Sequence, residues 1–221
     1  MSAAAVAVGA LAGVAAGLVA EPLVRRLPAG IEDALQQPAW TRALRRPPTM
    51  EVVGAVLGAA AGWRLGLVGP LVPALLLIAL LVPITFIDIE HRVIPDRLVF
   101  PGTAVALATW ALIDPGSLKE HGLAAIIACA VFLLMAIVYP AGMGLGDVKL
   151  ALLLGAFLGT AVVPGLFLGF VISAVPSMAI LLRYGRQGGK VGIPFGPFMA
   201  AGAFLGLLWG DQLIRWYLHA S

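Results

Sequence analysis

The stretch AGMGLGDVKLALLLG, residues 141–155, places an acid and a lysine at the start of a long apolar block. Gly142, Gly144 and Gly146 come directly before the acid, Asp147. Ionisable residues at the depth of a membrane are energetically costly, and by default they indicate a functional site. The first questions are therefore whether the surrounding chain is embedded in a membrane, and what a carboxylate does there.

The composition is that of a membrane protein. Hydrophobic residues make up 61% of the 221 residues and charged residues 11%, with a mean hydropathy of +1.03. These values exceed what a soluble domain of this length needs for its core. A transmembrane helix needs roughly 17 to 25 mainly apolar residues. Blocks that approach or reach this length occupy residues 3–20, 52–67, 71–87, 98–113, 123–139, 148–163, 166–182 and 193–209.

Unbroken apolar blocks favour helices over a β-barrel, whose strands alternate in hydrophobicity. We therefore expect an all-α polytopic membrane protein with about eight transmembrane helices, in a single domain over residues 1–221. The first block has no basic residues before it, so we expect a retained helix and not a cleaved signal. Glycines at four-residue spacing, such as Gly9, Gly13 and Gly17, let helices approach closely, either within one chain or between two copies. The oligomeric state stays unknown.

The basic residues predict the orientation of the chain. If the chain begins outside, most of its 14 Lys and Arg residues fall on one side, in segments 25–46, 92–97, 149 and 183–190. By the positive-inside rule this side is cytoplasmic, and both termini lie outside. We expect these cations to contact membrane lipid and not nucleic acid.

Two acidic segments emerge on the predicted cytoplasmic side. FIDIEHRVIPDRL, residues 86–98, contains Asp88, and GLGDVKL, residues 144–150, contains Asp147. Taken alone, Asp147 is also explained as a helix N-cap and Asp88 as an acid that reaches the membrane interface. If the two converge, like charges a few ångströms apart tend to share one proton. One carboxylate then acts as a base on a water, while the other polarises a scissile carbonyl.

The neighbouring residues have structural explanations. Asp96 follows Pro95 and is expected to cap a helix that starts near Leu98. His91 is expected to be solvated in a loop, and Lys149 to orient the helix or contact lipid. Gly142, Gly144 and Gly146 are expected to leave room for another chain to approach the carboxylate of Asp147.

Other catalytic chemistries find little support in the sequence. Three histidines and the single cysteine, Cys129, make no credible zinc site or internal disulfide. Ser173 and Ser177 have no histidine nearby in the chain, and GMGLGD lacks the context of a phosphate-binding loop. We therefore expect no metal and no cofactor.

Together these segments resemble the type IV prepilin peptidase family, membrane aspartic proteases of the Gly-x-Gly-Asp type that are related to archaeal preflagellin peptidases. The resemblance rests on DIEHRVIPDRL at 88–98, GMGLGDVKL at 142–150 and IPFGPFMA at 193–200. It implies that Asp88 and Asp147 are catalytic in the bacterial inner membrane. Its substrates are prepilins or pseudopilins, whose basic leader is cut at the cytoplasmic face just before an apolar helix. The candidate residues that shape the site or bind substrate are Gly144, Gly146, Lys149, Pro95, Asp96, Pro194, Phe195, Gly196 and Pro197.

The amino-terminal part departs from the longer members of this family. Those members carry a cytoplasmic loop with two zinc-binding Cys-x-x-Cys pairs, and they also methylate the new amino terminus. Residues 25–50 contain no cysteine, and LVRRLP at 23–28 resembles the methylation motif only faintly. Leader cleavage is therefore the expected activity, and N-methyltransferase activity is left open. The alternatives are a small proton-coupled transporter that uses the same acids, and a membrane platform for pilus or secretion machinery.

Overall fold

A computed structural model of the chain describes residues 2–25, 49–67, 69–140, 142–184 and 194–220. In these ranges the chain is helical and contains no strand, which confirms the all-α prediction. The loop at 25–50 that lacks cysteines lies almost entirely outside the described residues. The helices are α1 (Ala3–Arg25), α4 (Thr49–Leu65), α5 (Leu71–His91), α6 (Asp96–Ile113), α7 (Leu118–Val138), α8 (Leu145–Leu158), the short 3-10 helix η1 (Gly159–Ala161), α9 (Val162–Tyr184) and α10 (Gly196–Ala220).

Five segments of the described chain are long and apolar enough to cross a membrane, so the chain is an integral membrane protein. These segments are α5, α6, α7, most of α10, and the continuous stretch Leu145–Arg183 that contains α8, η1 and α9. The expected count of about eight spans is not confirmed. The apolar part of α1, Ala3–Val19, falls below the length of the five, and α8 has only 14 residues.

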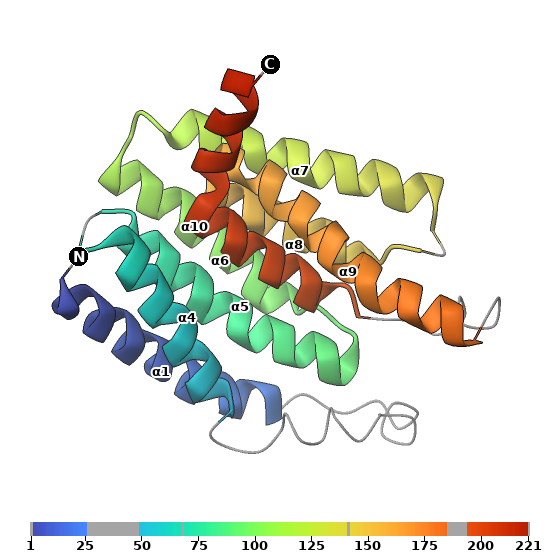
Figure 1. Ribbon diagram of the computed structural model, residues 1–221, viewed down its shortest axis with the longest axis horizontal. Helices are drawn as coiled ribbons and strands as arrows, with labels where there is room; N and C mark the ends of the chain where they lie inside the picture. Colours follow the sequence, from blue (N-terminus) through green and yellow to red (C-terminus); the bar gives the residue numbers. More distant parts are fainter. Residues whose placement is uncertain (1, 26–48, 68, 141, 185–193, 221) are drawn as a thin grey trace.

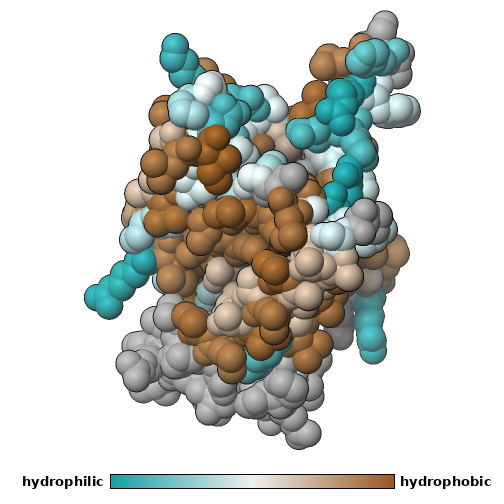
Figure 2. Space-filling model, turned by 90° about the vertical axis from the view of Figure 1, so that its left-hand side faces the viewer, coloured by the Kyte–Doolittle hydropathy of each residue, from teal (hydrophilic) through white to brown (hydrophobic). Residues whose placement is uncertain are grey.

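The outer surface of the bundle is suited to lipid. Large apolar side chains are widely exposed on it, among them Leu112 (85% exposed), Leu182 (79%) and Val138 (75%). Figure 2 looks at the end of the bundle that lies on the left in Figure 1, and it shows a broad apolar surface with hydrophilic residues mainly toward the edges. Contiguous apolar surface of this kind is favourable against hydrocarbon and unfavourable against water.

Helix α8 lies inside the bundle, whereas α1 and α4 form one side of it and α7 the opposite side (Figure 1). Most of α8 after its first turn is buried, including Leu150, Leu153 and Leu154. A helix that is apolar on all sides is expected to be surrounded by protein or lipid, and here the neighbouring helices supply the surroundings. Gly155 brings α8 against α7, because a Cβ at this position would lie 2.5 Å from the Cα of Ala125.

Three connections lie at the same end of the bundle, on the right in Figure 1. They are the turn between α5 and α6, the approach to α8, and the start of α10. Each contains one of the three sequence segments that carry the family resemblance. The helical hairpins of the bundle therefore collect residues from distant parts of the chain at one end.

The glycine seam of α1 packs against α4 within the chain. A Cβ on Gly13 would collide with the backbone carbonyl of Gly54, and one on Gly9 would collide with that of Gly58. A similar seam joins α10 to α9, where Gly202 lies against the backbone of Gly165. Small residues at such positions allow the close helix contacts that replace the hydrophobic effect inside a bilayer.

This packing predicts that Gly13→Val destabilises the protein, whereas Ala15→Val, at an exposed position of the same helix, does not. The valine at position 13 must push the backbones of α1 and α4 apart, and overpacking of this kind costs about 1–3 kcal/mol. Thermal unfolding of the purified proteins in detergent, followed by tryptophan fluorescence, measures the difference. Equal Tm values for the two variants would contradict the α1–α4 contact.

Candidate active site

Asp88 lies in the last turn of α5, at the end of the bundle where the three connections meet. Its side chain is 6% exposed, and its Oδ2 accepts a hydrogen bond of 3.0 Å from the backbone N–H of Gly196. The two residues are 108 positions apart in the chain. Helix α5 ends at His91 and is capped by Arg92, which has a left-handed backbone (φ 53°) and donates its N–H to the carbonyl of Asp88. A buried carboxylate is therefore held by the backbone of a different helix.

The PFGP segment at 194–197 brings the start of α10 to Asp88. A Cβ on Gly196 would lie 2.5 Å from Oδ2 of Asp88, so only glycine leaves room for the carboxylate. The ring of Phe195 packs against Phe170 of α9, with centroids 5.0 Å apart, and its carbonyl accepts the first N–H groups of α10. Pro197 lies in the first turn, where a missing N–H costs nothing. Pro194 precedes this turn.

Asp147 lies in the first turn of α8 and is partly buried. Its Oδ2 accepts a hydrogen bond of 3.3 Å from the backbone N–H of Gly144. The N-cap of α8 is Gly144, so Asp147 is not the N-cap itself, although it reaches back to that residue as an acid at the third helical position does. The segment that contains Asp147 lies beside the end of α5, since Gly146 packs against Ile94 of the turn that follows α5. Both acids therefore lie on helix ends that meet at one end of the bundle.

Lys149, which was expected to orient the helix or contact lipid, binds Asp96. Its Nζ donates to both carboxylate oxygens of Asp96, at 2.7 and 2.8 Å. This finding corrects the expected role of Asp96: α6 begins at Asp96 itself, with Pro95 in the N-cap position and no side-chain cap. The pair is substantially exposed, and such pairs contribute up to about 1 kcal/mol. It connects the first turn of α6 to the second turn of α8.

Gly146 allows the turn before α6 to lie against α8. A Cβ at this position would lie 3.2 Å from the Cβ of Ile94, which is closer than most packed side chains allow. The expected room for a substrate at Gly146 is therefore filled by the protein's own Ile94. Gly144 is different, because it is exposed and a Cβ there would meet nothing closer than 3.7 Å.

His91 was expected to be solvated but is buried, 9% exposed, as the last residue of α5. Neither of its ring nitrogens has a hydrogen-bond partner among the described residues, and Nε2 lies 3.7 Å from a carboxylate oxygen of Glu90. The sequence did contain a signal for this burial: a helix that continues to His91 places it on the same face as Asp88, three residues earlier. The hydrogen bond from Gly196 to Asp88 had no signal in the sequence beyond the presence of the PFGP segment.

Within the described residues, no group of three or more His, Cys, Asp or Glu side chains lies close enough together to hold a metal ion. The polar groups at this end of the bundle include the carboxylates of Asp88 and Asp147, each of which accepts a hydrogen bond from a glycine N–H, and the exposed pair of Lys149 with Asp96. Such a set is suited to proton transfer and hydrogen bonding to a substrate.

Known proteins that are similar to this chain belong to the family that its motifs resemble. The type IV leader peptidase family model matches residues 75–182. The chain is 36% identical over 182 residues to the prepilin leader peptidase/N-methyltransferase of Aeromonas hydrophila, covering 78% of this chain and 61% of that protein. It is 35% identical over 176 residues to the protein of the same name from Bacillus subtilis, covering 79% and 70%.

The corresponding protein of Pseudomonas aeruginosa is 33% identical over 181 residues, with 62% of its length covered. The chain thus spans less than two thirds of several relatives that it matches. No solved structure matches it. Similarity over most of the chain, which includes both aspartates, shows that the chain belongs to the type IV leader peptidase family.

Proposed function

We propose that this protein is a membrane aspartic endopeptidase that removes the short basic leader of type IV prepilins or pseudopilins, with Asp88 and Asp147 as its catalytic pair. The single observation that carries the proposal is that the end of α5, which contains Asp88, and the start of α8, which contains Asp147, lie at the same end of an apolar bundle. Family membership supports a prepilin-type substrate. We expect the protein to lie in the bacterial inner membrane, with the active site facing the cytoplasm and both termini outside.

In the proposed reaction, one aspartate is ionised and the other protonated. The ionised carboxylate takes a proton from a water, whose oxygen attacks the carbonyl carbon of the scissile peptide. The protonated carboxyl donates a hydrogen bond to the carbonyl oxygen as negative charge develops there. When the tetrahedral intermediate collapses, the C–N bond breaks and a proton passes to the leaving amine. Water and peptide are the only reactants.

The surrounding residues position this pair. Gly196 donates its N–H to Asp88 and leaves space for it, and Lys149 holds the start of α8 to Asp96 of α6. We do not extend the assignment to methyl transfer, although the names of the relatives include it. The chain covers only part of several of those relatives, and its residues 25–50 lack the cysteine pairs of the longer members.

Asp88→Asn and Asp147→Asn are each expected to lower cleavage by about 10²–10⁴-fold, because an amide neither accepts nor supplies the proton that the reaction needs. The assay uses purified protein in detergent and a substrate with a basic leader followed by an apolar helix. Asp114→Asn, an exposed acid in the turn between α6 and α7, is the matched control. Near-normal cleavage by either pair variant, with the wild type active, would rule out the dyad.

Gly196→Ala is expected to lower both stability and cleavage. The new methyl group would lie 2.5 Å from Oδ2 of Asp88 in a buried site, so it must displace the carboxylate or the start of α10, at about 1–3 kcal/mol. Cleavage should fall at least about tenfold, since small displacements of reacting groups are costly. Tm and kcat/KM are measured on the same preparation. Unchanged values would show that Asp88 is not held against Gly196.

Gly144→Ala is expected to lower cleavage without lowering stability. Its backbone (φ −80°, ψ 151°) accepts alanine, and the added methyl group would lie 3.7 Å from Oδ2 of Asp147, so Tm should stay at the wild-type value. If a substrate backbone passes over Gly144, cleavage should nevertheless fall severalfold. Wild-type cleavage by this variant would show that the substrate does not pass here.

A further inference from the structure

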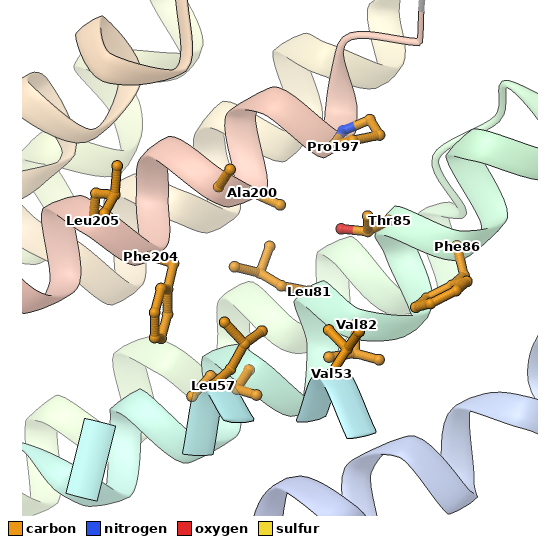
Figure 3. A pocket seen from close by; sticks show the side chains of 12 residues that line it. Val53, Leu57, Leu81, Val82, Thr85, Phe86, Pro197, Ala200, Phe204 and Leu205 are labelled. Carbon is orange, nitrogen blue, oxygen red and sulfur yellow. The ribbon is translucent and has the colours of Figure 1, made fainter. Parts of the chain in front are cut away.

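An apolar groove of about 340 Å³ lies between α4, α5 and α10 (Figure 3). Among the side chains that line it, only Thr85 carries a polar atom. Nothing in the proposed cleavage chemistry uses these residues. The lining residues are Val53 and Leu57 of α4, Ile78, Leu81, Val82, Thr85 and Phe86 of α5, and Pro197, Ala200, Ala201, Phe204 and Leu205 of α10.

The two longer walls of the groove follow one face of a helix each. Between Ile78 and Phe86 on α5, and between Pro197 and Leu205 on α10, the lining positions recur at three- and four-residue spacing. Each wall therefore continues for about 12 Å along its helix, at 1.5 Å per residue. A groove between two apolar helix faces is the kind of site that binds the apolar face of a third helix.

One end of the groove is continuous with the candidate active site. Thr85 lies one turn before Asp88 on α5, and Pro197 directly follows Gly196, which donates its N–H to Asp88. Figure 3 shows Thr85 and Pro197 at the same end of the groove, with Phe204 and Leu205 toward the other. A chain that lies in the groove would therefore end next to the turn of α5 that contains Asp88.

We propose that this groove binds the apolar helix that follows the scissile bond of the substrate, and so sets which bond lies at the two aspartates. This inference rests on the proposed function. The volume accommodates a few large side chains and not a whole helix, so the substrate would insert one face, with anchors about one turn apart. Ala200 and Ala201 on the α10 wall are small, which allows the close approach of helices inside a bilayer.

The first test compares two substrates and two variants. Ala201→Phe fills the groove from an exposed position of α10, and Ala108→Phe is the matched control at an exposed position of α6 outside it. One substrate has a basic leader and an apolar helix; the other is a soluble peptide that ends shortly after the scissile bond. Ala201→Phe is expected to raise KM at least tenfold for the helical substrate alone, and Ala108→Phe to change neither KM value.

The second test detects binding without cleavage. In Cys129→Ala protein made inactive by Asp147→Asn, a cysteine is placed by Ala201→Cys or, as control, by Ala108→Cys. The helical substrate carries a single cysteine about one turn after its scissile bond. Oxidation is expected to form a disulfide with position 201 and not with position 108.

The possible failures can be told apart. If the wild type cleaves both substrates, Ala201→Phe behaves like Ala108→Phe and position 201 forms no disulfide, the groove is not the binding site, while the proposed function stands. If a photoreactive phosphatidylethanolamine labels the groove and added helical substrate does not displace it, the occupant is a lipid and the inference is wrong. If the wild type cleaves neither substrate, the proposed function fails and the inference fails with it.

Discussion

The hydrogen bond from the backbone N–H of Gly196 to the carboxylate of Asp88 is the interaction on which this end of the molecule depends. A buried carboxylate without a partner is costly, and the cost rises in apolar surroundings. A backbone donor meets this need without introducing a further charge. Only glycine allows it, since any side chain would overlap the carboxylate. The start of α10 is thereby drawn against the end of α5, and the groove between these helices begins at the same point.

The second constraint is the burial of α8. Fourteen residues extend about 21 Å, which is less than the roughly 30 Å of a hydrocarbon core. A helix of this kind is best placed inside a ring of longer helices, and Gly155 lets it approach α7 closely. The exposed ion pair of Lys149 with Asp96 also links the start of α8 to α6. Two acids on different helices are thus placed by helix packing and by one backbone hydrogen bond each, from Gly196 to Asp88 and from Gly144 to Asp147.

Much of this arrangement was predictable from local patterns. The apolar blocks gave the approximate helix positions, because the length of a continuous apolar stretch is a property of neighbouring residues. The basic residues predicted that Asp88 and Asp147 lie on one side of the membrane, and the end of α5 and the start of α8, which contain these acids, do lie at one end of the bundle (Figure 1). The prediction that His91 is solvated was wrong, since this residue is buried. Whether a residue at the end of an apolar run is buried depends on the helices that pack against it, which the local sequence does not show. Asp96 was wrongly expected to cap a helix. Its carboxylate binds Lys149, and a partner 53 positions away cannot be recognised from the residues around Asp96.

The sequence by itself determined the membrane-embedded all-α class, the approximate helix positions and the two acids that require an explanation, because composition and periodicity are properties of neighbouring residues. Tertiary structure alone decided that Gly13 of α1 packs on α4, that Gly196 holds Asp88, and that an apolar groove leads away from this pair. Hydropathy cannot distinguish a helix that faces lipid from one that faces protein, since both surroundings are apolar. Which faces meet is decided by close packing of the whole bundle, and no local pattern contains that information.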